Sequence, residues 1–140
     1  MRRAALVVIV VLLTLGASGA SAKPGEGSTQ IKLHLVPPNS GKYGIYLDEY
    51  AFWGEMLAYS NPHCFERRRF TLFKNGVEFA STASKGPAGS FVFKLGPSAT
   101  GTYVAKSPEK ILPAGQSQLP PGMRKPVVCT ATVSNVVSVP

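Results

Sequence analysis

The chain has 140 residues, and its 15 lysines and arginines against 7 aspartates and glutamates give a formal charge of +8. A chain of this length forms about one domain, which excludes multidomain enzyme architectures. Apolar residues make up 44% and charged residues 16%, a balance typical of folded rather than disordered proteins. With 14 glycines and 12 prolines, we expect a folded domain with many turns.

The N-terminus has the three parts of a secretory signal peptide. Two arginines precede an apolar stretch from Ala4 to Leu15, and small residues follow it up to Ala22. Cleavage before Lys23 removes 22 of the 140 residues and leaves 118, with 13 basic against 7 acidic residues, or +6. The apolar stretch falls short of the roughly 20 residues of a transmembrane helix. We therefore expect secretion, with no membrane span after cleavage, and take an uncleaved anchor as the alternative.

Cys64 and Cys129 are the only cysteines, and they lie 65 residues apart. Because exported domains use paired cysteines as crosslinks, we expect one disulfide between them. In the chain-entropy model a loop of this length contributes about 4 kcal/mol of stability. The alternatives are a catalytic thiol and a metal ligand, with His34 and His63 as the only histidines available to assist.

The first half of the chain predicts strands separated by turns. After a polar leader at 23–28, residues 29–35 alternate apolar and polar side chains, as a half-buried strand does. Prolines and Asn-Ser-Gly then predict a loop. The aromatic-rich stretch that follows predicts short strands near 43–47 and 51–60, or one strand with a bulge at Gly54. Trp53 is expected in the core.

The second half contains the strongest local signal. Asn75-Gly76 supplies two residues that tolerate positive φ between 68–74 and 77–82, so we predict a β-hairpin with a type I′ turn. Further strands are expected at 90–95, with its aromatic side chains inward, and at 102–106. Four prolines and two glycines in 107–125 predict a long surface loop, either functional or mobile. One or two strands are expected within 127–139, interrupted at Asn135.

About seven short strands, no helical periodicity and a distant cysteine pair predict an all-β fold. We expect an antiparallel β-sandwich over 29–140 with immunoglobulin-like topology and one disulfide.

The chain also resembles a group of secreted bacterial immunoglobulin-like modules, similar to carboxypeptidase-regulatory-like and transthyretin-like sandwiches. The resemblance covers residues 30–139. It rests on glycine, aromatic and cysteine positions: Phe52-x-Gly54 and Ser60, Cys64-x-x-x-Arg68-x-Phe70-x-Leu72-Phe73, Gly89-x-Phe91-x-Phe93, Gly101-x-Tyr103-x-Ala105, and Cys129-x-x-x-x-Ser134-x-x-Val137-x-Val139. It implies the sandwich fold and the Cys64–Cys129 bridge, and it carries over no functional residues. The proline-rich stretch before Cys129 departs from the usual short connection.

No catalytic set is recognisable in the sequence. Asp48 is the only aspartate, and neither the G-x-S-x-G elbow nor the phosphate-binding G-x-x-x-x-G-K-[ST] pattern occurs. His63 and Cys64 are adjacent, but neighbouring residues of an extended chain point to opposite faces. The acidic residues Asp48, Glu49 and Glu55 favour a solvated loop over a weak calcium site. We expect no enzyme activity, cofactor or metal.

Arg67, Arg68 and Arg69 form the densest basic run and are the candidate polyanion contacts. Strand alternation sends Arg67 and Arg69 to one face and Arg68 to the other with Phe70. Charges at the start of a strand also discourage edge-to-edge aggregation. Nucleic acid is not expected as a partner, since no stacking platform of recognisable spacing is present.

The sequence thus predicts a secreted, non-enzymatic module with an accessory or binding role. Its partner would be a protein or a component of the cell envelope, bound through loop 107–125 or the aromatic stretch Tyr43 to Tyr59. The alternative is a basic protein that binds polyanions or the envelope surface.

Overall fold

The computed structural model describes residues 26–58, 61–84 and 89–140, so the predicted signal peptide at 1–22 lies outside the described residues. These residues form strands and single 3-10 turns, which confirms the all-β prediction. The strands are β1 Thr29–Val36, β2 Ala51–Ala58, β3 Arg69–Lys74, β4 Val77–Ala83, β5 Ser90–Lys94, β6 Gly101–Ser107, β7 Lys110–Leu112, β8 Val127–Cys129, β9 Thr132–Val133 and β10 Val137–Val139. The turns are η1 Lys42–Gly44, η2 Pro62–Cys64, η4 Ala114–Gln116 and η5 Pro121–Met123.

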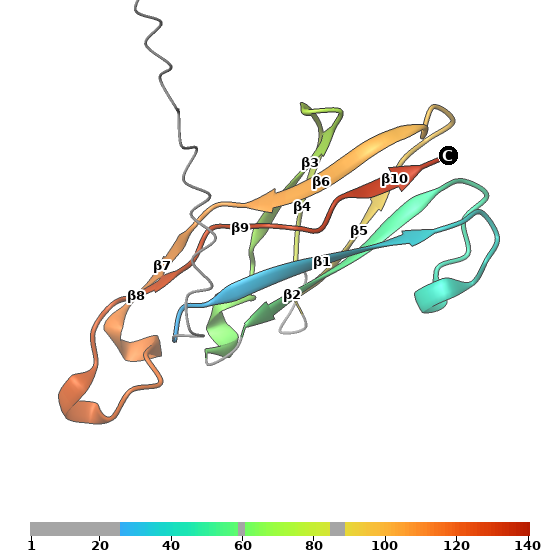
Figure 1. Ribbon diagram of the computed structural model, residues 1–140. Helices are drawn as coiled ribbons and strands as arrows, with labels where there is room; N and C mark the ends of the chain where they lie inside the picture. Colours follow the sequence, from blue (N-terminus) through green and yellow to red (C-terminus); the bar gives the residue numbers. More distant parts are fainter. Residues whose placement is uncertain (1–25, 59–60, 85–88) are drawn as a thin grey trace, which may run out of the picture.

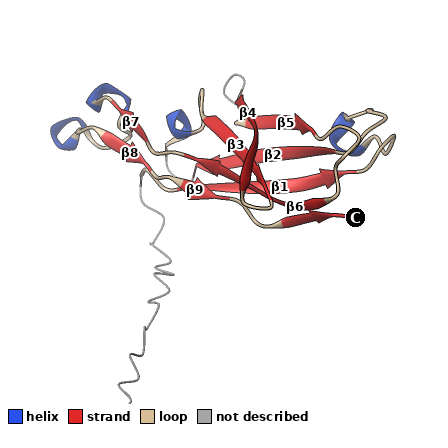
Figure 2. Cartoon of the chain, turned by 90° about the horizontal axis from the view of Figure 1, so that it is seen from above, coloured by secondary structure: helices blue, strands red, loops and turns tan. Residues whose placement is uncertain are grey.

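Two antiparallel sheets pack against each other (Figures 1 and 2). One has three strands in the order β1-β2-β5, and the other has the order β4-β3-β6-β10, with β9 pairing to β6 beside β10. Strand alternation sends every second side chain into the space between the sheets. Across that space Phe70 of β3 stacks on Phe91 of β5 with ring centroids 3.9 Å apart, and Phe52 of β2 meets the edge of Tyr103 of β6.

Gly54 is an ordinary position of β2 and carries no bulge, because the pairing of β1 with β2 is continuous along all eight residues. Packing against a neighbouring aromatic ring explains why this position is a glycine. The ring of Phe91 lies over it, and a Cβ at position 54 would come within 2.1 Å of that ring. The absence of a side chain therefore leaves room for the Phe91 ring that stacks on Phe70.

The predicted strand 43–47 is wrong. Gly41, Tyr43 and Gly44 have φ angles of 65°, 54° and 72°, and left-handed residues cannot extend a strand. They form η1, which folds back so that the Tyr43 ring stacks on the Trp53 ring, with the ring centroids 4.4 Å apart. The prediction of Trp53 in the core is also wrong, because its neighbours Phe52 and Gly54 point inward and Trp53 therefore points outward.

Several strand predictions are confirmed. Asn75 and Gly76 have φ angles of 49° and 82° and connect β3 to β4 in the predicted hairpin. β5 points Phe91 and Phe93 inward, as its alternation predicted. The hairpin register shifts by one residue between Leu72 and the next position, a bulge that the sequence did not indicate.

Residues 107–125 are not a loop without regular structure. β7 lies between Pro108 and Pro113 and pairs with β8, placing Ile111 opposite Val128. The prolines bracket this short strand instead of interrupting it. With η4 and η5 between them, β7 and β8 form an arm, residues 108–130, at the end of the molecule away from η1 (Figure 1). The segment 127–139 accordingly holds three strands, where one or two were expected.

The predicted Cys64–Cys129 disulfide is confirmed, and it lies outside the main core. It joins η2, which follows β2, to β8 of the arm. Both cysteines are fully buried with Leu112 and Val127 in a second, smaller apolar cluster. The bridge therefore fixes the base of the arm to the sandwich.

We expect the double substitution Cys64→Ala/Cys129→Ala to lower the free energy of unfolding by about 4 kcal/mol, since the unfolded chain regains the freedom of a 65-residue loop. Urea unfolding of both proteins under oxidising conditions measures the difference. The same comparison with reductant present is the control, in which the gap should nearly close. An unchanged midpoint for the oxidised pair would show that the bridge does not stabilise the fold.

Candidate functional site: a buried arginine and an open trough

The three consecutive arginines go to three different places. Arg68 is 2% exposed and points inward with Phe70, whereas Arg67 and Arg69 are exposed, as alternation predicted. Arg67 reaches the surface for a further reason, since its φ of 50° places it in a turn before β3 begins. The candidate polyanion contact therefore presents two separate guanidinium groups, and Arg68 is withdrawn from it.

Arg68 holds the base of the arm. Its Nε donates to Ser107 Oγ at 3.2 Å, and Nη1 donates to the carbonyl oxygen of Cys64 at 3.0 Å. Nη2 donates to the carbonyl oxygens of Pro108 at 2.7 Å and Thr130 at 3.1 Å. These acceptors belong to η2, the end of β6, and both ends of the arm. A single side chain thus crosslinks every segment that meets there.

The buried guanidinium has no carboxylate within 4 Å among the described residues, whose ion pairs are confined to His34–Glu55 and His63–Glu66. Burial lowers the pKa of Arg68 from its ordinary value because removal from water disfavours the charged form. Carbonyl and hydroxyl dipoles must therefore compensate the charge. This makes the hydrogen-bond geometry around Arg68 decisive for its stability.

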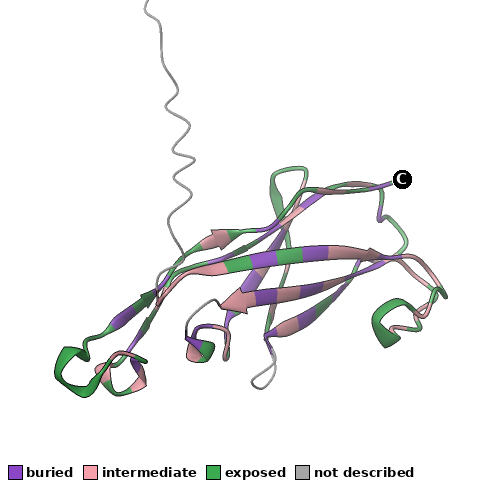
Figure 3. Ribbon diagram, turned by 60° about the horizontal axis from the view of Figure 1, so that its bottom comes forward, coloured by how far each residue is buried: buried purple, intermediate pink, exposed green. Residues whose placement is uncertain are grey.

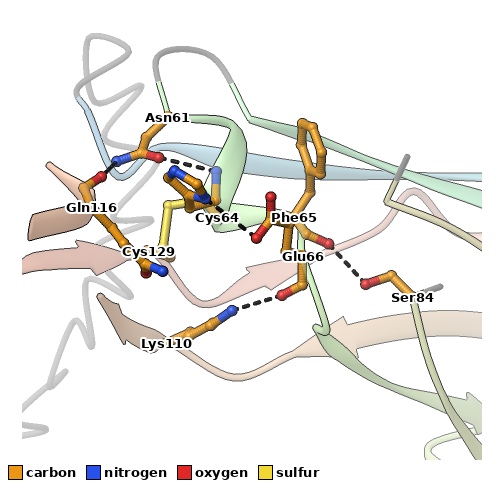
Figure 4. Close-up of polar contacts among 9 residues, drawn as sticks. Asn61, Cys64, Phe65, Glu66, Ser84, Lys110, Gln116 and Cys129 are labelled. Carbon is orange, nitrogen blue, oxygen red and sulfur yellow. Dashed lines mark hydrogen bonds and ion pairs between the residues drawn. A yellow bond between two sulfur atoms is a disulfide. The ribbon is translucent and has the colours of Figure 1, made fainter. Parts of the chain in front are cut away.

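Further hydrogen bonds join the same junction, and Figure 4 shows those from Ser84 to Phe65 and from Lys110 to Glu66. Ser84 Oγ donates to the carbonyl oxygen of Phe65 at 2.8 Å and accepts from the backbone N–H of Arg68 at 2.9 Å. Lys110 Nζ donates to the carbonyl oxygen of Glu66 at 2.7 Å. Burial, and then the charge of Arg68, lower the pKa of Lys110. The junction consequently concentrates positive charge beneath the arm.

The outer part of the arm is fixed by Asn61 and the N-terminal segment. Asn61 Nδ2 donates to the carbonyl oxygen of Gln116 at 2.8 Å, and to Glu26 Oε1 at 3.2 Å (Figure 4 draws the first contact). Gly27 lies against the arm so closely that a Cβ there would come within 1.8 Å of the Val128 carbonyl oxygen. The arm is thus an ordered part of the fold.

The reactive groups named from the sequence do not converge. The structure contains no free cysteine, so Cys64 has no thiol to offer to His63, whose ring instead lies 3.2 Å from Glu66. Glu49 accepts a hydrogen bond from the backbone of Gly96. Within the described residues no three His, Cys, Asp or Glu side chains are grouped so as to hold a metal ion.

The outer face of the larger sheet is hollowed. Its larger hollow has a volume of about 510 Å³ and its smaller one about 330 Å³. Both are lined by Phe73 of β3 and Lys106 of β6, so they adjoin at these two side chains, and we call the pair of hollows the trough. The larger hollow also includes Arg69, Thr71, Pro108 and Val133. The smaller also includes Asn75, Thr102, Val104 and Val136.

The trough combines an apolar floor with two cations. Lys106 lies opposite Thr71 and Val133 in the strand register, and its Nζ is 4.7 Å from the Phe73 ring centroid. Val133 and Val136 are 57% and 64% exposed. No acidic residue lines either hollow, although Glu78 lies opposite Phe73 on β4. An apolar ligand with negative charge matches this surface.

The aromatic stretch selected from the sequence is only partly available. Tyr43 and Tyr46 are 52% and 79% exposed at the η1 end, and Tyr43 covers Trp53 there. Tyr50 packs against the core, and Tyr59 lies outside the described residues. At the opposite end the arm is mostly exposed around η5 (Figure 3).

Comparison of the chain with protein-family models, with curated proteins and with solved structures finds no match. In the part of the chain that the structure describes, no helix has the length and apolar character needed to cross a membrane.

Replacing Arg68 with leucine should lower the free energy of unfolding by about 3 kcal/mol, because buried carbonyl groups lose their donor. Thermal and urea unfolding measure this. Arg67→Leu, at the exposed neighbouring position, is the matched control and should change stability by less than about 0.5 kcal/mol. Equal losses in the two variants would contradict a crosslinking role for Arg68.

Proposed function

We propose that the protein is a secreted, non-enzymatic immunoglobulin-like module that binds a partner through the trough. One observation carries the proposal: two adjoining hollows of the outer sheet face, lined by apolar side chains together with the cations Arg69 and Lys106. Concave apolar surfaces with a few polar groups are the usual form of a ligand site. The side chains that line it offer contact area and charge, which suits binding better than catalysis.

The strand order supports the immunoglobulin-like part of the proposal. The sheets β1-β2-β5 and β4-β3-β6-β10 have the order of immunoglobulin strands A-B-E and C′-C-F-G. The disulfide differs, since in antibody domains it joins strands B and F through the core. Here it joins the two connections that follow those strands, β2–β3 and β6–β10.

Export is supported by the signal-like N-terminus and by the disulfide, which persists in oxidising compartments. The partner is accordingly placed at the cell envelope or outside the cell. The arm and the aromatic η1 end border the sandwich at its two ends and leave the trough face open.

Polyanion binding is the second candidate, because Arg67 remains exposed beside Lys110 in a separate hollow of about 520 Å³. The two functions differ in how they depend on charge. Polyanion affinity falls steeply with salt and depends on the number of cations, while an apolar trough depends mainly on its floor.

The substitution Phe73→Ser should reduce binding of the labelled, signal-free protein to isolated cell envelopes by about tenfold, since it removes apolar area from the trough floor. Arg67→Gln, outside the trough, should leave this binding unchanged. Each protein is titrated with envelopes, and separately with heparin as a polyanion probe, at two salt concentrations. If Arg67→Gln lost envelope binding and this binding fell steeply with salt, the protein would act by polyanion recognition and not through the trough.

A further inference from the structure

We infer that the ligand of the trough is an anionic amphiphile, with one negatively charged head group and an extended apolar tail. This inference rests on the proposed function and names its ligand class. The cations define the head-group end, and the apolar floor defines the direction of the tail.

The two cations of the trough are not neutralised within the molecule. Neither Arg69 nor Lys106 has a carboxylate within 4 Å among the described residues, and residues 1–25, 59–60 and 85–88 contain no acidic residue. Lys106 instead lies over the Phe73 ring. Arg69 and Thr71 share the outer face of β3, and Lys106 is paired with Thr71. A carboxylate, sulfate or phosphate oxygen at Thr71 would meet both cations and a hydroxyl donor.

The apolar floor leads away from this point in one direction. Beyond Thr71 comes Phe73, whose ring is next to Lys106, and Val104 and Val136 continue the apolar lining in the smaller hollow. The rise of β3 from Thr71 to Asn75 is about 13 Å, the length of an extended chain of about ten carbon atoms. Covering the exposed side chain of Val136 removes apolar surface from water and favours such a tail.

The acidic neighbours give the ligand its orientation. Glu78, opposite Phe73, lies beside the tail section and would repel a head group there. Glu109 follows Pro108 at the other end but lines neither hollow, whereas Arg69 and Lys106 both line the larger one. An anionic head is therefore favoured in the larger hollow, and the smaller hollow has no cation besides Lys106, which suits one charge better than a chain of charges.

The test compares three ligands with the same ten-carbon tail and different head groups, all below their micelle concentrations: decanoate, decanol and decyltrimethylammonium. The signal-free protein, residues 23–140, is titrated with each and followed by amide NMR shifts. Decanoate should bind at least tenfold more tightly than either other ligand, and its shifts should fall on β3, β6 and β9. Equal affinity for decanol would overturn the head-group assignment.

Three single substitutions locate the head group. Lys106→Gln should weaken decanoate binding about fivefold, the effect of one exposed charge pair, with no change for decanol. Glu78→Gln should tighten decanoate binding, because it removes a repulsive charge. Lys94→Gln changes an exposed lysine on β5 in the other sheet and should have no effect. An equal loss of decanoate affinity in Lys94→Gln and Lys106→Gln would show that decanoate is attracted nonspecifically to the positive charge of the protein, and would overturn the inference.

The failure of this inference can be separated from that of the proposed function. If no amphiphile shifts the trough residues while Phe73→Ser still abolishes envelope binding, the ligand class is wrong and the trough remains the binding site. If decanoate shifts residues around Tyr43 and Trp53 instead, the assignment of the ligand to the trough is wrong.

Discussion

The buried guanidinium group of Arg68 is the interaction on which the arm end of the molecule depends. Taking a charge out of water is costly, and no carboxylate within the described residues compensates for it. One hydroxyl and three carbonyl groups from separate segments do so instead. The carbonyl group of Cys64 is among them, so the covalent crosslink and the polar crosslink meet at one residue. Neither the β6–β7 corner nor the β8–β9 corner can move without leaving part of this charge unsatisfied.

Local chemistry explains which parts of the fold were predictable. Asn75-Gly76 encodes its turn in two residues, and a chain with only two cysteines offers each of them a single partner. The prolines of 107–125 were misleading because they mark the limits of β7 as well as the turns. The position of Tyr43 depends on three successive backbone conformations that its residue types permit and do not require. Trp53 was placed in the core on hydrophobicity, although the alternation with Phe52 places it outside.

The candidate site was less accessible from sequence than the fold. Arg69 was selected for its charge, but its partners in the trough come from another strand. Lys106 and Phe73 become neighbours only through the pairing of β3 with β6, a register between distant segments that a single sequence does not specify. The alternation of side chains along each strand was the available signal, because it correctly places Thr71 and Phe73 on the opposite face of β3 from Phe70. It says which side chains share a face, but not which strands lie side by side.

The position of the disulfide divides the chain into a closed ring and two free ends. The ring from Cys64 to Cys129 contains β3 to β8, whereas β1 and β2 precede it and β9 and β10 follow it. The two free ends meet where Asn135 bonds both backbone groups of Leu33. Opening at this seam breaks no covalent constraint, so the strands next to the chain ends can separate while the ring stays folded. The trough spans both parts, with β3 and β6 inside the ring and β9 outside it, and a ligand lying across it would therefore hold β9 against the ring.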